Sequence, residues 1–135
     1  LIPEIQEKLT EIKRPPIHVE IGGLNYFDNP RQPILFADVL STRKLETLVA
    51  DITDKLAPIC EKEGIKFNPR PYRPHITLAR LKKTPKDNIE KYIKQHGNKI
   101  KGRFLAEEFH LIHSGKPDES GARYKPIQSY RLTPH

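Results

Sequence analysis

The residues best suited to chemistry are His75 and Thr77, which lie two positions apart directly after Pro74. Proline fixes its own φ and pushes Arg73 toward extended geometry, so this run is expected to form a β-strand. Side chains alternate between the faces of a strand, which places His75 and Thr77 on one face. A group that titrates near neutral pH then lies beside a hydroxyl. Such a pair can move a proton and hydrogen-bond a phosphate oxygen.

The opposite face of this strand carries Ile76 and Leu78, which we expect to contribute to the core. Strict alternation places Arg80 on that face as well. We therefore expect Arg80 to reach the His75 face only if the strand bends or ends there. A lone His-x-Thr pair is common in strands, so an ordinary structural role stands beside the catalytic one.

Periodicity and turn residues predict the elements that position this strand. Apolar residues at helical spacing predict helices over residues 2–12, 45–59 and 89–93. Extended or alternating runs predict strands over residues 17–21, 34–40, 104–114 and 124–132, besides the His75 strand. This order of elements suits an α+β fold with mostly antiparallel sheets better than a doubly wound fold.

Three dipeptides bear on where these elements begin and end. Gly22-Gly23 is expected to break the first strand, and Glu63-Gly64 is expected to end the long helix. Thr84-Pro85 is expected to cap and start the third helix, with Ile89 and Tyr92 in the buried stripe of that helix.

The length of 135 residues suits one domain, so we expect residues 1–135 to form a single domain. No long apolar run or secretory signal is visible, which argues against a membrane partner and against secretion. Cys60 is the one cysteine of the chain, so no internal disulfide can form, and a reducing, cytoplasmic setting fits. The sequence contains no metal-ligand spacing, P-loop or dinucleotide fingerprint, so we expect no cofactor.

The net charge of +7 is concentrated in one stretch of the chain. Residues 80–103 contain nine Lys or Arg residues but only two acidic ones, Asp87 and Glu90, whereas the rest of the chain is balanced. The stretch begins where the His75 strand ends. A polyanion such as RNA fits it as a partner, and a solvated helix face is the other interpretation.

Several segments together resemble a known family. Residues 73–80 (RPHITLAR) closely resemble the second signature of the 2H phosphoesterases. More narrowly, they resemble the LigT-like RNA 2′,3′-cyclic phosphodiesterases, also called 2′-5′ RNA ligases. The resemblance continues, in the expected order along nearly the whole chain, through residues 22–27, 29–31, 111–114 and 121–124.

This resemblance implies a LigT-like α+β fold, with mostly antiparallel sheets around a central groove and helices outside. It implies hydrolysis of RNA ends that carry a 2′,3′-cyclic phosphate, or reversible 2′-5′ ligation, with two histidines as acid and base and no metal. RNA or a nucleotide with such a phosphate is the implied partner.

The resemblance also suggests a role for individual residues. In this chain His75 matches one catalytic acid or base, and Thr77 matches one phosphate contact. Arg80 is expected to contact phosphate. Tyr72 and Arg73 are expected to line the mouth of the groove, with a surface position as the alternative for Arg73.

One departure from the family bears on activity. The family carries two His-x-Thr/Ser motifs, one in each pseudo-symmetric lobe, whereas this chain contains one. We therefore expect the fold to be N-terminally incomplete and to retain one half-site. The rival hypotheses are a non-catalytic phosphate- or RNA-binding remnant and a fragment that needs a second chain. Unpaired strand edges would favour a homodimer.

No other histidine matches the absent motif. His18 has Glu20 where a threonine would be expected. His110 and His113 differ by three positions, so a strand would present them on opposite faces. The second acid or base is therefore left open at this point.

Overall fold

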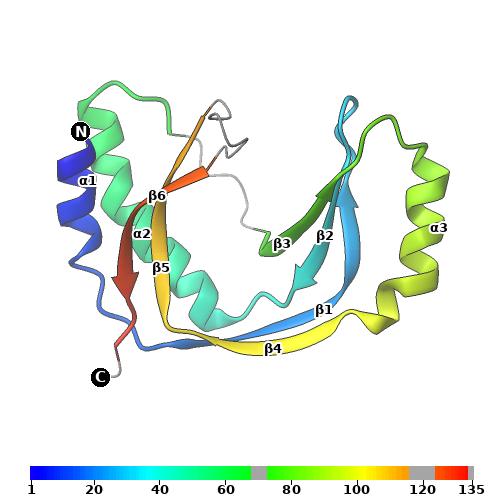
Figure 1. The fold of residues 1–135 in the computed structure, drawn as a ribbon. Helices are drawn as coiled ribbons and strands as arrows, with labels where there is room; N and C mark the ends of the chain where they lie inside the picture. The colour runs from blue at the N-terminus through cyan, green and yellow to red at the C-terminus, as the bar shows by residue number, and fades with distance from the viewer. Residues whose placement is uncertain (68–72, 116–123, 134–135) are drawn as a thin grey trace. The chain divides into compact units, whose positions relative to one another are not determined.

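The computed structural model describes residues 1–67, 73–115 and 124–133. These residues cluster into two compact units, which Figure 1 shows as ribbons. The first unit comprises the described residues of 1–17, 43–71 and 106–135, and the second comprises those of 18–42 and 72–105. Within this described part of the chain, no helix is long and apolar enough to cross a membrane.

The second unit is built on a four-stranded sheet in the order β3-β2-β1-β4. Its strands are β1 (Ile17–Phe27), β2 (Ile34–Val39), β3 (His75–Arg80) and β4 (Lys101–Ala106). The strand β2 pairs antiparallel with both β1 and β3. Helix α3 (Lys86–His96) and the short 3-10 helix η1 (Gly97–Lys99) precede β4. The antiparallel pairing and the mixture of elements confirm the expected α+β class.

Helix α3 packs on one face of this sheet (Figure 1). Ile89 of α3 is buried, as are Leu24 and Ala37 on the strands. The Tyr26 hydroxyl donates a hydrogen bond of 2.9 Å to the Glu90 carboxylate. Loss of solvent around the phenol, followed by this bond, raises the pKa of Tyr26 to about 12.

A β-bulge lies in β1 at the position where the two glycines predicted a break. Ile21 pairs with Val39 and Leu24 pairs with Ala37, so β1 has one more residue than β2 between these pairs. Gly23 takes a positive φ of 94°, which glycine tolerates, and its N–H donates to the Ile100 carbonyl at 2.9 Å. The strand therefore continues to Phe27, and the predicted break was wrong.

The first unit packs helices α1 (Ile2–Leu9) and α2 (Arg43–Lys62) with the antiparallel pair β5 (Glu108–Ser114) and β6 (Tyr124–Arg131). Its buried apolar side chains are Leu9, Ile12, Ile17, Leu48, Ile59, Tyr130 and Leu132. Helix α2 ends before Gly64, which has a positive φ of 68°, so the predicted helix end is confirmed.

The single strand predicted over residues 104–114 is in fact two strands. β4 ends at Ala106 as part of the four-stranded sheet, and β5 begins at Glu108 as a partner of β6. Glu107 separates them, and its carbonyl accepts a hydrogen bond of 2.7 Å from the Leu132 N–H. The apolar pattern runs through both strands, so periodicity alone did not show the change of sheet.

Two expectations of burial were wrong. Ile76 is 37% exposed and Leu78 is 51% exposed, because β3 is an edge strand of its sheet. Tyr92 is 50% exposed and contacts the His96 ring at a centroid distance of 4.5 Å. Thr84 does not cap α3 either, since its hydroxyl donates to the Lys82 carbonyl.

Candidate functional site

A second bulge, in β3, determines on which face of the sheet the candidate side chains lie. Phe36 pairs with Thr77, and the next residue back along β2, Leu35, pairs with Ala79. Leu78 is therefore an extra residue on β3 with no partner of its own in the ladder. Residues after the bulge lie on the opposite face from the one that strict alternation predicts.

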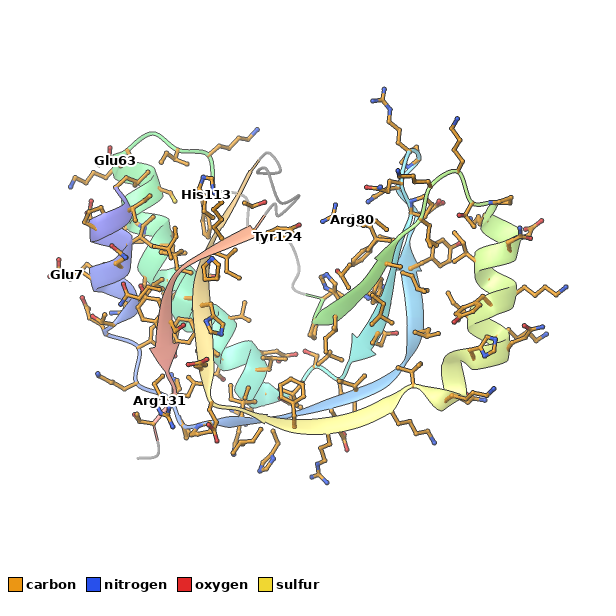
Figure 2. The ribbon with its side chains drawn as sticks, in the orientation of Figure 1. Glu7, Glu63, Arg80, His113, Tyr124 and Arg131 are labelled. Atoms are coloured by element: carbon orange, nitrogen blue, oxygen red, sulfur yellow. The ribbon has the colours of Figure 1, made fainter. Side chains whose placement is uncertain are left out.

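The bulge brings His75, Thr77 and Arg80 onto one face of β3. Directly opposed residues in an antiparallel pair point to the same side, and Arg80 is opposite Ile34 on the face that carries Phe36. The bulge at Leu78 thus meets the condition under which Arg80 reaches the His75 face. Figure 2 shows Arg80 at the end of β3. All three side chains are exposed, so they form an open surface rather than a buried pocket.

The His75 ring lies against two aromatic rings from the neighbouring strands. Its centroid is 5.0 Å from that of Phe27, at 89° between the planes, and 5.3 Å from that of Phe36, at 64°. Phe27 and Phe36 are themselves 4.4 Å apart, and Phe36 is fully buried. Edge-on aromatic packing of this kind restricts the orientation of the imidazole.

The backbone determines which nitrogen of His75 carries the proton in the neutral ring. Nδ1 lies 2.8 Å from the carbonyl oxygen of Arg73. A carbonyl can only accept a hydrogen bond, so Nδ1 must donate and Nε2 is left with its lone pair. Nε2 is therefore the atom of His75 that can take a proton.

Arg73 lies beside His75 on this surface. Its guanidinium carbon lies 5.1 Å from the Phe36 ring centroid and 6.0 Å from that of Phe27. Its Nη2 atom is 3.3 Å from Oδ1 of Asp38, the residue opposite His75. Arg73 thus lies on the same rings as His75, although it is also half exposed.

Sequence reasoning assigned no role to Phe27, Phe36 or Asp38. Phe27 reaches the His75 face because the bulge at Gly22-Gly23 shifts the alternation of β1. A glycine pair inside an alternating run was the signal that could have indicated such a bulge. Tyr72, also predicted at the mouth of the site, lies outside the described residues.

The remaining histidine of this unit with a candidate role is His18. It lies on β1 with Glu20, on the face that also carries His75. The register separates His18 and His75 by about four residues along the sheet, or roughly 13 Å at 3.3 Å per residue. The two rings therefore cannot share one phosphate directly.

The first unit carries a histidine with a different set of partners. Nδ1 of His110 lies 2.8 Å from the Ser129 hydroxyl, and Nε2 lies 3.6 Å from the Glu108 carboxylate. Alternation along β5 places His113 on the face opposite His110, as predicted. Within residues 1–67, 73–115 and 124–133, no group of three His, Cys, Asp or Glu side chains is arranged to hold a metal ion.

The described residues thus form two β-sheets, and His75, Thr77 and Arg80 share one face of β3. A family model described as the 2′-5′ RNA ligase superfamily matches residues 1–118. The chain therefore belongs to the 2′-5′ RNA ligase superfamily. No curated protein sequence matches the chain.

Two solved structures have a similar fold. The crystal structure of Escherichia coli LigT complexed with 3′-AMP has a TM-score of 0.68 and 20% identity, covering 98% of this chain and 69% of that chain. The crystal structure of TT0787 of Thermus thermophilus has a TM-score of 0.68 and 21% identity, covering 99% of this chain and 72% of that chain. These similarities confirm the LigT-like fold.

Proposed function

We propose that this chain acts as a phosphoesterase on RNA ends that carry a 2′,3′-cyclic phosphate, with His75 as one acid or base. The observation that supports this best is the common face of His75, Thr77 and Arg80. Membership of the superfamily and the 3′-AMP bound by LigT also favour a nucleotide ligand. Because Cys60 is the one cysteine of the chain, we also infer a cytoplasmic setting.

The reaction needs a proton to be removed and another to be supplied. Water attacks the phosphorus, a new P–O bond forms, and the bond to one ribose oxygen breaks. Neutral His75 can accept the proton of the attacking water at Nε2, or protonated His75 can give a proton to the leaving ribose oxygen. With the 5′-hydroxyl of a second RNA end in place of water, attack on the phosphorus forms the new P–O bond, the bond to the 3′ oxygen breaks, and that oxygen takes a proton. The two ends are then joined through a 2′-5′ bond.

Thr77 and Arg80 are suited to contact the phosphoryl oxygens, whether water or an RNA hydroxyl attacks the phosphorus. A hydroxyl donor and a guanidinium stabilise negative charge that shifts onto these oxygens in the transition state. The site as proposed contains one histidine of a pair, because the sequence has one His-x-Thr motif. We therefore expect turnover to be weak for this chain alone, since each positioned acid or base contributes roughly 10²–10⁴-fold.

The test is hydrolysis of a nucleoside 2′,3′-cyclic phosphate in the presence of EDTA. His75→Ala should lower kcat/KM to the uncatalysed background. His110→Ala is the matched control, because His110 is also an exposed strand histidine with a hydrogen-bonded Nδ1. Equal rates for the wild type and His75→Ala would contradict the proposal.

A second arm of the experiment separates the rival hypotheses. The outer edge of β3 pairs with no strand among the described residues, and such an edge can add a strand from another chain. Activity measured together with the mass in solution distinguishes a monomer from a homodimer. Binding of a cyclic-phosphate nucleotide without turnover in either state would favour a non-catalytic remnant.

A further inference from the structure

We propose that the single-stranded RNA leading to the terminal phosphate runs over a basic rim at one end of the four-stranded sheet. The rim consists of Arg31, Arg80, Lys82, Lys83 and Lys86. The inference rests on the proposed function and deepens it, because it makes an oligoribonucleotide a better ligand than a single nucleotide.

Two loops form the rim, and contacts between them hold it together. The Leu81 N–H donates a hydrogen bond of 2.8 Å to the Pro33 carbonyl, which joins the β3–α3 loop to the β1–β2 connection. Lys86 Nζ lies 3.7 Å from Oδ2 of Asp28, which joins the start of α3 to the same connection. Figure 1 shows both loops at the same end of the sheet.

The rim begins at the proposed phosphate site. Arg80 shares a face with Thr77 and is the last residue of β3. Lys82 and Lys83 follow almost immediately, and both side chains are exposed. A strand whose terminal phosphate lies at Thr77 would therefore meet Arg80 and then the two lysines as it leaves the site. A single nucleotide has no second phosphate to place there.

The ammonium groups of Lys82 and Lys83 are available to bind a ligand. Neither side chain forms an ion pair with any residue that the structure describes, whereas Lys86 is paired with Asp28. Contacts to phosphates are the main source of affinity in sequence-independent RNA binding, and exposed lysines make them with little reorganisation.

The backbone at Lys83 is unusual in a way that supports a role for its side chain. Lys83 has a φ of +44°, and it is the one non-glycine residue with positive φ in the described ranges. Glycine adopts this conformation more easily than lysine. A lysine at this position is unfavourable for the fold, which fits a residue needed for its charge.

Because of this positive φ, Lys83 can be replaced by glycine, which removes the charge without destabilising the fold. Lys83→Gly removes the charge and suits the positive φ, so the melting temperature should stay the same or rise. We combine it with Lys82→Gln. The matched control is Lys91→Gln with Lys94→Gln, which neutralises two exposed lysines on α3, outside the rim.

The probe is a fluorescein-labelled decaribonucleotide that ends in a 2′,3′-cyclic phosphate, and its binding is followed by anisotropy across a salt series. The rim pair should weaken binding about ten- to thirtyfold at 0.1 M salt and reduce the log–log salt slope by about 0.7 for each phosphate that no longer meets a lysine. The α3 pair should change the affinity by less than about threefold. Hydrolysis of a nucleoside 2′,3′-cyclic phosphate should be unchanged by either pair.

The outcomes separate this inference from the proposed function. If the rim double variant and the α3 double variant lose the same RNA affinity, the RNA is attracted by the overall positive charge and not held along the rim. That result would overturn the inference. Unchanged affinity in the rim pair would also overturn it, even if the nucleotide is hydrolysed. Rim-dependent RNA binding without any hydrolysis would support the path and contradict the catalytic proposal.

Discussion

His75 on β3 and His110 on β5 make an instructive comparison, because both are exposed strand histidines with a partner 2.8 Å from Nδ1. The partner of His75 is a carbonyl, which forces Nδ1 to donate and leaves the Nε2 lone pair available. The partner of His110 is the Ser129 hydroxyl, which can donate to Nδ1, while the Glu108 carboxylate lies 3.6 Å from Nε2. The chemical type of each partner, rather than the exposure of the ring, distinguishes a reactive nitrogen from an occupied one.

An aromatic ring on each of the two sheets allows a comparison of burial, and the largest expected effect tests that difference. Phe36 is fully buried and contacts both Phe27 and His75. Phe36→Ala should destabilise the protein by about 3–5 kcal/mol, because it removes a large side chain and leaves a cavity. The Phe109 ring stacks on Tyr130 at a centroid distance of 5.0 Å but is only partly buried. Phe109→Ala should therefore destabilise the protein less than Phe36→Ala does.

Denaturation followed by circular dichroism measures both variants, together with hydrolysis of the cyclic nucleotide. Only Phe36→Ala should also reduce hydrolysis of the cyclic nucleotide, since the Phe36 ring packs against the His75 ring. A larger loss of stability from Phe109→Ala would contradict this view of where the core contributes most.

The hydroxyls near the two histidines should differ in their effect on turnover. Thr77→Val keeps the shape and the β-propensity of the side chain but removes one phosphate donor, and should lower kcat by about 10²-fold. Ser129→Ala removes the partner of His110 and should leave kcat within about twofold of the wild type. A fall in both variants would indicate that His110 takes part in the reaction.

The tautomers of the two rings can be observed directly. Nitrogen NMR under alkaline conditions, with both rings neutral, should show Nδ1–H for His75 and Nε2–H for His110. The reason is that a carbonyl must receive a proton, whereas a carboxylate near Nε2 favours the proton there. An Nε2–H signal for His75 would remove the basis for assigning it as the proton acceptor at that atom.

The sequence predicted part of this site and missed part of it, for identifiable reasons. Pro74 and the alternation of β3 are local features, so the strand and the common face of His75 and Thr77 were predicted and are confirmed in the structure. The face of Arg80 depends on a bulge at Leu78, which exists only through pairing with β2. Long-range pairing of that kind leaves little trace in a single sequence.

The same limit explains two other differences. Periodicity identified an apolar run after residue 103 but could not show that the chain leaves one sheet for another at Glu107. Helical spacing likewise placed Tyr92 on the buried stripe, although its ring is half exposed. In both cases the outcome depends on which other elements pack against the strand or helix, and a single sequence does not show those tertiary contacts.

The smallest expected effect concerns the ion pair between Arg14 and Asp51 in the first unit. The Arg14 guanidinium contacts both carboxylate oxygens, at 2.5 and 3.2 Å, and this bonding lowers the pKa of Asp51 below its ordinary value. A lowered pKa means that the pair contributes its full stability above the unfolded pKa near 3.8. The contribution is then lost as the pH falls through the folded value.

Asp51→Asn should therefore reduce stability at pH 7 by less than about 1 kcal/mol, because both side chains of the pair are partly exposed to solvent. The difference between the variant and the wild type should shrink as the pH falls below 3.8 and should vanish only below the lowered pKa of folded Asp51, where the wild-type carboxylate is also protonated. Urea titrations at pH 7 and at a series of acidic pH values below 3.8 measure both quantities. Asp54→Asn serves as the control because Asp54 shares the helix but forms no ion pair among the described residues. A difference that persists unchanged at low pH would show that Asp51 acts through packing or capping and not through its charge.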